Sequence, residues 1–392
     1  MKLGFLGAYS IANAGDALVG YATRRSVLEL LPGVEYEVLA PALPHAFWDH
    51  GWDAERGLGD AIRAVPATTD CRWASDFDAM IIGGGGVVLL DPSFAPFSLG
   101  DPEQWPVRCA AAWNGVGSQN QPWYLRAHLA DYARIKQCCE RLAYVSVRSQ
   151  TTLRFVRACG FAGAVHVVPD PAIGLASVPA EADQVVDKLL ASLALEPQRG
   201  RTRRLLGLSL GAATASPTAT RFFAELEHEL KILAADCDLV FFPFSRLQDD
   251  IAAQTALAHR LGARVITDVL SPLTLWALIG RLDAYVTSRF HGVIAAYTQD
   301  VPFVAVDEYL RDAVASSKIR ELIVDRGLEV HYVCPFLPDA SVWKITAVAR
   351  DLERVSFREK IVEDRRQLAA HYPAMLSKLG LAVRAEFVEA VR

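Results

Sequence analysis

The chain has 392 residues and a formal net charge of −5 at pH 7. This length exceeds what one ordinary hydrophobic core holds, so we expect two domains of roughly 150–200 residues each. Hydrophobic residues make up 52% of the chain and charged residues 22%, which excludes a disordered protein. The negative charge excludes a global positive field for nucleic acid, so any anion site must be built locally.

Strand-like and helix-like segments alternate along the first half of the chain. The sequence predicts strands at 2–8, 35–40, 78–84, 110–117, 144–148 and 165–170, and helices at 15–31 and 123–142. Apolar, β-branched runs separated by turn residues are typical of the buried strands of a parallel sheet. Residues 1–180 therefore predict one Rossmann-like α/β domain.

The alternation lapses after residue 177, and the Pro/Gly/Arg-rich segment 181–204 is predicted to be a linker. Further strands are then predicted at 205–211, 239–244, 263–269, 283–288 and 302–307. These predict a second Rossmann-like domain over 205–340, followed by a helical tail over 341–392. Two doubly wound domains of this kind would face a cleft, with ligands beyond the carboxyl ends of the strands.

The cysteines and the N-terminus bear on the compartment. Seven cysteines, an odd number without metal-ligand spacing, favour a reducing compartment over a disulfide framework. The stretch "MKLGFLGAYSIANAG" is a poor signal peptide, because it has one basic residue and a short apolar run. The longest apolar run, 79–90, is too short and too glycine-rich to span a bilayer. We therefore expect a cytoplasmic protein.

Polar residues and glycines follow two of the predicted strands. Asn13 and Asp16 lie where the first helix begins, so each could cap that helix or face a ligand. The glycine run 83–86 ends another strand, and it suits close approach of the backbone to another segment or to a ligand. Exposed N–H groups in such a loop form an anion-binding nest. The residues assigned to substrate binding from these two stretches are Asn13, Gly84, Gly85 and Gly86.

Two arginines and a histidine also lie at predicted strand ends. Arg148 ends the strand 144–148, and Arg289 and His291 lie in "SRFHG" (288–292), between a strand and a helix. An unpaired buried charge costs several kcal/mol, so these cations are either paired for structural reasons or hold an anion in a cleft. Guanidinium groups suit carboxylate and phosphate oxygens, and one from each domain would form a two-sided clamp. The alternatives are a surface arginine at 148 and a helix-start histidine at 291.

The sequence also resembles a known family. The ordered series "NAGD" (13–16), "GGGG" (83–86), "SVRS" (146–149), "VPDPA" (168–172), "FFPFSRLQDD" (241–250) and "SRFHG" (288–292) resembles the polysaccharide pyruvyl transferase family. The segment "SSKIRELIVDRGL" (316–328), after "VPFVAVDE", is similar to that family's closing segment. The resemblance implies a fold similar to the B-type glycosyltransferases, the donor phosphoenolpyruvate and a sugar acceptor.

The resemblance also implies roles for single residues. By position, Arg148, Arg289 and His291 match residues that hold or activate the donor. Lys318 resembles the family's basic residue after the last strand, although a longer gap before it leaves Arg311 as an alternative. Ser288, in the same motif, is predicted to bind substrate.

The implied reaction moves the enolpyruvyl group of phosphoenolpyruvate onto a sugar of a polysaccharide precursor or glycolipid, forming a pyruvate ketal and releasing phosphate. It needs an acid near carbon 3 of the donor and a base near the sugar hydroxyl, each worth roughly 10²–10⁴-fold. The predicted catalytic residues are His291, Asp16, Arg148 and Arg289. His291 would be the acid or a hydrogen-bond donor to the phosphate group, and Asp16 would be the base or the group that orients the acceptor. We expect no metal and no cofactor besides the co-substrate.

The acceptor is assigned to the first domain, where several tryptophans could stack on sugars. The expected role is in exopolysaccharide or cell-wall polysaccharide biosynthesis, with no nucleic-acid partner. If the acceptor is lipid-linked, we expect the enzyme to act at the inner face of the membrane. Peripheral membrane contact and homo-oligomerisation stay open.

Two alternatives from other functional classes remain. A nucleotide-sugar-dependent glycosyltransferase of the same architecture is one, because a helix start such as that after "SRFHG" also suits a diphosphate. A non-catalytic sugar- or anion-binding protein that retains the cleft is the other.

Overall fold

The structure is a computed structural model, and its contacts divide the chain into two compact units. The first unit contains residues 1–11, 16–174 and 362–392, and the second contains residues 12–15 and 175–361. The residues that the structure describes are 1–9, 13–42, 61–83, 85–88, 96–118, 129–195, 202–211, 217–244, 250–268, 270–308, 317–337, 340–350 and 356–383.

The first unit is built on a seven-stranded parallel sheet with the order β3-β2-β1-β4-β5-β6-β7. Its strands are β1 (Lys2–Leu6), β2 (Glu35–Ala42), β3 (Ile62–Pro66), β4 (Ala79–Gly83), β5 (Ala110–Val116), β6 (Tyr144–Val147) and β7 (His166–Val167). Its helices are most of α1 (Ala14–Leu30), η2 (Arg72–Asp76), α2 (Leu129–Arg141), α3 (Gln150–Ala158), η5 (Pro171–Gly174) and most of α11 (Arg358–Lys378). The strand order reverses between β1 and β4, as in a doubly wound fold.

The second unit repeats this plan with a six-stranded parallel sheet in the order β10-β9-β8-β11-β12-β13. Its strands are β8 (Arg204–Ser209), β9 (Cys237–Phe241), β10 (Arg264–Val265), β11 (Ala284–Thr287), β12 (Phe303–Val306) and β13 (Tyr332–Val333). Its helices are α4 (Ala180–Ser192), α5 (Pro217–Leu233), α6 (Asp250–Leu261), α7 (Pro272–Gly280), α8 (Phe290–Thr298), α9 (Lys318–Asp325), η7 (Glu329–His331) and α10 (Trp343–Ala349). The order again reverses at its first strand, between β8 and β11.

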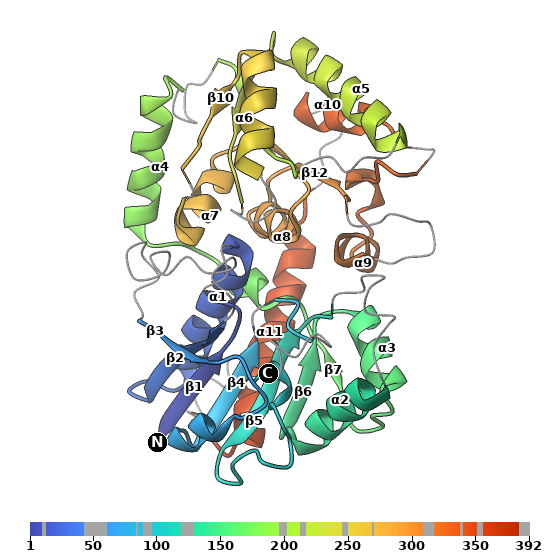
Figure 1. The fold of residues 1–392 in the computed structure, drawn as a ribbon. Helices are drawn as coiled ribbons and strands as arrows, with labels where there is room; N and C mark the ends of the chain where they lie inside the picture. The colour runs from blue at the N-terminus through green and yellow to red at the C-terminus, as the bar shows by residue number, and fades with distance from the viewer. Residues whose placement is uncertain are drawn as a thin grey trace. The chain divides into compact units, whose positions relative to one another are not determined.

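The central strands are largely apolar because helices cover the sheets. Every residue of β4, β11 and β12 is buried, and the side chains of alternate residues enter the hydrophobic core of the respective unit. Figure 1 shows the helices packed against each sheet. The predicted fold class, two Rossmann-like doubly wound domains, is confirmed; the cleft between them stays a prediction.

Serine side chains define where several helices begin. Ser149 accepts a hydrogen bond from the Thr152 N–H at the start of α3, and Ser271 accepts one from the Thr274 N–H at the start of α7, both at 3.1 Å. Such N-caps satisfy backbone donors that have no partner within the helix, and each contributes about 1 kcal/mol.

The segment predicted as a linker, 181–204, differs most from the structure. Residues 180–192 form α4, which packs against α7. Arg281, at the end of α7, places Nη2 3.0 Å from Oδ1 of Asp183 on α4. Contacts divide the chain at Gly174, not at residue 180, so α4 belongs to the second unit. The sequence analysis did not show what the buried face of this segment would meet.

The predicted C-terminal tail also differs, because its helices belong to different units. The side chains of Ile345 and Val348 on α10 lie in the core of the second unit. Most of α11 instead belongs to the first unit, and Figure 1 shows this red helix beside the strands of that unit.

A hydrogen-bond chain holds α11 to the first sheet. Nε2 of His371 lies 2.8 Å from the amide oxygen of Asn114, and its Nδ1 lies 3.1 Å from the Tyr144 hydroxyl. An amide oxygen only accepts, so Nε2 carries the hydrogen and Nδ1 accepts from the tyrosine. The Asn114 amide then donates to the Thr23 hydroxyl at 2.9 Å. Burial, with a further contribution from nearby His166, lowers the pKa of His371 to about 3.

We expect His371 to make the fold sensitive to acid. Its pKa in the folded chain lies below the ordinary value, so its contribution to stability is present above pH 6.5 and is lost as the pH falls towards 3. Between about pH 7 and about pH 4.5 this group should lower the free energy of unfolding by about 2–3 kcal/mol. Urea unfolding of His371→Gln should show a weaker pH dependence by that amount. The exposed His259→Gln is the matched control, and an unchanged pH dependence in His371→Gln would contradict the assignment.

Candidate functional site

The motif "SRFHG" forms the corner between β11 and α8 in the second unit. The Thr287 hydroxyl accepts a hydrogen bond from the Arg289 N–H at 3.0 Å and donates one to the Ser209 carbonyl at 3.2 Å. Arg289 has an extended backbone and directly precedes α8, so the chain passes from strand to helix at this residue. The corner therefore joins the carboxyl ends of β8 and β11, where doubly wound folds bind ligands.

Gly292 lets α8 lie close to the end of β11. A Cβ atom at this position would stand 2.6 Å from the hydroxyl oxygen of Thr287 and 3.0 Å from that of Tyr285. The glycine of the motif is thus required for packing, and it brings the first turn of α8 against the strand end.

Arg289 and Glu308 both lie against the backbone of Gly211, which follows β8. A Cβ atom at Gly211 would overlap the Glu308 carboxylate and stand 3.2 Å from Nη2 of Arg289. Arg289 is 8% exposed, so its charge lies in a largely dehydrated place. A cation there attracts an anion more strongly than a cation in water does.

Ser288 has an internal role at the same corner. Its hydroxyl accepts a hydrogen bond from the Gly211 N–H at 2.7 Å, and the residue is 1% exposed. Ser288 therefore ties the chain that follows β8 to the end of β11, while its contact with substrate stays a prediction.

His291 lies in the first turn of α8, buried, with its ring 5.0 Å from that of Phe290 in an edge-on contact. Gly15 belongs by its contacts to the second unit, and a Cβ atom there would overlap Nδ1 of His291. Asn13 precedes α1, and its side-chain oxygen accepts a hydrogen bond from the Gly15 N–H at 3.1 Å. Asn13 therefore caps α1; its role in substrate binding stays a prediction.

Lys318 is the first residue of α9 and lies beside the "SRFHG" corner. Its Nζ is 5.6 Å from the centre of the Phe290 ring. Ser317 caps α9 by accepting a hydrogen bond from the Arg320 N–H at 3.0 Å, and its hydroxyl donates to the carboxylate of Asp307. The start of α9 is thus fixed to the end of β12. The structure brings Ser288, Arg289, His291 and Lys318 together around adjacent strand ends.

Asp307 is a residue of this corner that the sequence analysis missed. It is fully buried, and besides Ser317 it accepts a hydrogen bond from the Tyr332 hydroxyl at 2.8 Å. Burial and the neighbouring carboxylate raise the pKa of Tyr332 far above its usual range, so this hydroxyl remains a donor. Asp307 therefore positions Lys318 through the cap of α9. Arg311, the alternative to Lys318, lies outside the described residues.

In the first unit, Asp16 and the glycine run meet at the carboxyl edge of the sheet. Gly85 has a φ of +97°, and a Cβ atom there would overlap the Asp16 carboxylate. The Gly85 carbonyl accepts a hydrogen bond from the Gly117 N–H at 3.0 Å. Close approach of the glycine run to other segments is observed, and its role in substrate binding stays a prediction. Gly84 lies outside the described residues, and Gly86 is half-buried.

Arg148 follows β6 and is paired inside the first unit. Its Nη1 lies 2.6 Å from Oδ2 of Asp170, and the two side chains are 4% and 2% exposed. The other oxygen of Asp170 accepts a hydrogen bond from the Ala172 N–H at 3.0 Å, within η5. Gly117 leaves room for the guanidinium group, because a Cβ atom there would stand 2.7 Å from its Nε. The surface alternative for Arg148 is wrong, and structural pairing is observed; its role towards a donor stays a prediction.

We expect Arg148→Met to lower the free energy of unfolding by roughly 3–5 kcal/mol, because the Asp170 carboxylate then stays buried without its cation. The double variant Arg148→Met/Asp170→Asn removes both charges and should regain part of this loss. Denaturant unfolding measures both effects, with the exposed Arg154→Met as the matched control on α3. A double variant no more stable than Arg148→Met would show that the pair does not act as a unit.

Carboxylates at strand ends are the main feature that the sequence analysis missed. Asp170, Asp307 and Glu308 each follow a strand and lie near a predicted cation or near the helix that carries one. The stretches "VPDPA" and "VAVDE" place an acidic residue directly after an apolar run, and that is the signal that could have found them. The cation beside each carboxylate depends on contacts between distant segments.

The described tryptophans of the first unit belong to its core. Trp105 and Trp113 are buried, and each indole N–H donates to a backbone carbonyl at 2.8 Å. Trp73 packs edge-on against Trp105, with ring centres 6.3 Å apart. Trp48 and Trp52 lie outside the described residues, and the acceptor side stays a prediction.

Other reactive groups add little to the site. All seven cysteines are buried and free of disulfides, and burial raises the pKa of Cys71 and Cys109 to about 12, which keeps these thiols protonated. Within the described ranges, no group of three or more His, Cys, Asp or Glu side chains could hold a metal ion. No helix in the same ranges is both long and apolar enough to cross a membrane.

Solved structures with the same two-domain fold include enzymes that act on nucleotide sugars. The chain is similar to a glycosyltransferase from Rickettsia africae, with a TM-score of 0.57 and 9% identity over 97% of this chain and 99% of that one. It is also similar to the UDP-GlcNAc 2-epimerase of Methanocaldococcus jannaschii, solved with UDP-GlcNAc and UDP, with a TM-score of 0.55 and 13% identity over 91% and 94% of the two chains. At these identities the similarity shows the fold alone, which is of the B-type glycosyltransferase kind.

The family is shown by sequence. A family model for polysaccharide pyruvyl transferase matches residues 13–308. This range includes the "SRFHG" motif, the glycine run and Arg148, whereas Ser317, Lys318 and Tyr332 follow it. Because the match spans more than half of the chain, the chain belongs to the polysaccharide pyruvyl transferase family. It is therefore a polysaccharide-modifying transferase. No curated protein matches the chain in a direct sequence search.

Proposed function

We propose that the chain transfers the enolpyruvyl group of phosphoenolpyruvate to a sugar of a polysaccharide precursor or glycolipid, and that it forms a pyruvate ketal and releases phosphate. One observation carries this proposal: Arg289, His291 and Lys318 lie around a single corner of the second unit, where β8, β11 and β12 end. The donor is a small molecule with a carboxylate and a phosphate, and two cations with a histidine suit both groups.

The surroundings of this corner support strong anion binding. Arg289 and His291 are 8% and 5% exposed, so a bound anion would replace water there and interact in a low dielectric. Hydrogen bonds fix the backbone on both sides of Arg289, through Thr287 and Ser288. The binding groups are thus held in place before the donor arrives, which reduces the entropy lost on binding.

The proposed reaction sets the roles of these groups. Carbon 3 of the donor takes a proton, and the first sugar hydroxyl forms a bond to carbon 2, where positive charge develops. A second hydroxyl then bonds to carbon 2 as the bond from that carbon to the phosphate oxygen breaks, and phosphate leaves. His291 is the proposed acid, or else a hydrogen-bond donor to the phosphate group. Arg289 and Lys318 bind the anionic groups. Asp16 is the proposed base or orienting group, and Arg148 a further donor ligand, on the strength of their places at the carboxyl edge of the first sheet.

The proposal assigns no metal and no cofactor, with phosphoenolpyruvate as the co-substrate. A cytoplasmic location follows from the donor, which is a cytoplasmic metabolite, and a lipid-linked acceptor would place the work at the inner face of the membrane.

We expect Arg289→Lys to weaken phosphoenolpyruvate binding about tenfold or more, because lysine keeps the charge and loses the bidentate fork. Arg289→Ala should abolish binding. The measurement is the rise in unfolding temperature with added phosphoenolpyruvate. Arg221→Ala, an arginine with an 82% exposed side chain in the same unit, is the matched control.

The same titration separates this function from a nucleotide-sugar-dependent glycosyltransferase. Stabilisation by a UDP-sugar and not by phosphoenolpyruvate would overturn the proposal. Near-normal stabilisation of Arg289→Ala by phosphoenolpyruvate would instead remove this corner as the donor site.

His291→Ala should reduce turnover more than donor affinity. Loss of a general acid costs roughly 10²–10⁴-fold in rate, whereas Arg289 and Lys318 remain to bind the donor. Phosphate release that depends on an added acceptor gives kcat, and thermal stabilisation gives the affinity. A loss confined to affinity would make His291 a binding group and not the acid.

A further inference from the structure

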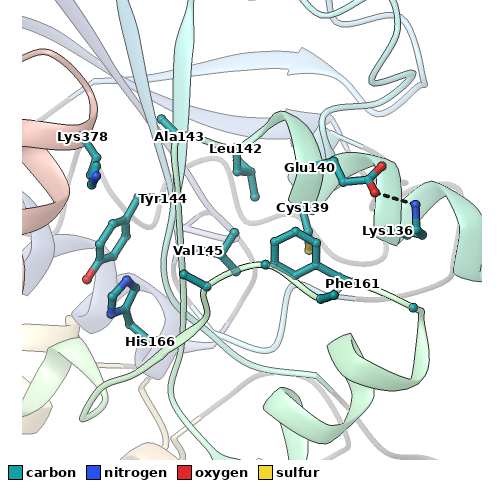
Figure 2. Close-up of a pocket in the computed structure, with 14 residues that line it drawn as sticks. Lys136, Cys139, Glu140, Leu142, Ala143, Tyr144, Val145, Phe161, His166 and Lys378 are labelled. Atoms are coloured by element: carbon teal, nitrogen blue, oxygen red, sulfur yellow. Dashed lines mark hydrogen bonds and ion pairs between the residues drawn. The ribbon is translucent and has the colours of Figure 1, made fainter.

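A pocket of about 580 Å³ lies in the first unit, apart from the corners described above. It is formed by the end of α2, the start of β6, the connection from α3 to β7, and the end of α11 (Figure 2). Its volume lies within the range of small-molecule sites, roughly 300–1,000 Å³. The pocket lies at the amino end of β6, whereas Arg148 follows the carboxyl end of the same strand.

The polar side chains around the pocket give it a positive balance. Lys136 and Glu140 form an ion pair along α2, with side chains 42% and 47% exposed. Lys378 is exposed and has no ion-pair partner among the described residues. In Figure 2 it lies on the same side of the pocket as Tyr144 and His166. One neutralised pair and one further cation leave a net positive site for an anion.

The remaining lining is apolar and aromatic. The rings of Tyr144 and His166 are stacked, with centroids 4.4 Å apart and planes 3° apart, and His166 is exposed. Phe161 and Val145 form other parts of the wall. Figure 2 shows Phe161 beside Cys139 and Val145, and Tyr144 between Lys378 and His166.

We propose that this pocket binds one unit of an acidic saccharide. A sugar acid combines a carboxylate, a ring of hydroxyl groups and an apolar ring face, and the pocket offers a partner for each. Lys378 suits the carboxylate, the Glu140 and Lys136 pair can accept from and donate to hydroxyls, and the aromatic and apolar wall suits the ring face. A simple anion or an apolar molecule would leave part of this lining unpaired.

This inference goes beyond the proposed function, because it requires neither phosphoenolpyruvate nor the chemistry at "SRFHG". It assigns a second saccharide contact to a member of a polysaccharide-modifying family. A contact of this kind would hold an acidic polymer to the first unit by a sugar other than the one that reacts, which raises the effective concentration of the polymer.

The test is a binding titration of the whole chain with glucuronate, followed by ligand-observed NMR, with glucose and benzoate as the two comparison probes. We expect glucuronate to bind more tightly than either probe, because only glucuronate presents both the carboxylate and the hydroxyls. Lys378→Met keeps most of the unbranched apolar side chain and removes its charge, and should weaken glucuronate binding about tenfold. Lys188→Met, at an exposed lysine on α4, is the matched control and should bind as the parent chain does.

Three results would overturn the assignment. Absence of glucuronate binding would remove the site, and equal binding by Lys378→Met and the parent chain would place the contact elsewhere. Benzoate bound as tightly as glucuronate would show a general pocket for organic anions and not a saccharide site. Because no donor and no turnover enter the measurement, these outcomes are independent of the proposed transferase reaction.

Discussion

The candidate site of the second unit depends on the hydroxyl group of Thr287. One oxygen accepts from the Arg289 N–H and donates to the Ser209 carbonyl, so it joins two adjacent strand ends and also sets the backbone that leads into α8. A buried backbone N–H without a hydrogen-bond partner costs free energy, so loss of this geometry would destabilise the fold. The side chains of Arg289 and His291 branch from this same turn of backbone, so their directions depend on its geometry.

Glycines complete this arrangement in both units by letting charged side chains pass close to the backbone. Gly211 makes room for Arg289 and Glu308, Gly117 for Arg148, and Gly85 for Asp16. In a close-packed interior even one methyl group cannot be added at such places without moving a neighbour. Charged groups can then approach the strand ends while remaining largely buried.

The two arginines occupy similar places in their sheets, and a carboxylate lies near each: Asp170 beside Arg148, and Glu308 against Gly211 together with Arg289. Arg148 is bound to Asp170 with almost no exposure, so much of its charge is used within the fold. In the second unit, the Asp307 carboxylate accepts hydrogen bonds from Ser317 and Tyr332. It thereby fixes the start of α9, which carries Lys318. A buried charge pair is weak evidence for stability by itself, but it does fix geometry. The carboxylates therefore act mainly by positioning the cations.

The sequence by itself determined the repeated α/β plan, because the apolar runs that form buried parallel strands are local features. It also located "SRFHG", the glycine run and Arg148 at strand ends, since each directly follows such a run. The edge strands β3 and β13 were not predicted: β3 is mostly exposed and β13 has two residues, so neither carries the apolar signal of a central strand. Only the tertiary structure decided that α4 belongs to the second unit, that α11 returns to the first, and that Asp170 meets Arg148. Those outcomes depend on which buried faces and opposite charges meet across long stretches of chain, and a local pattern of residue types does not contain that information.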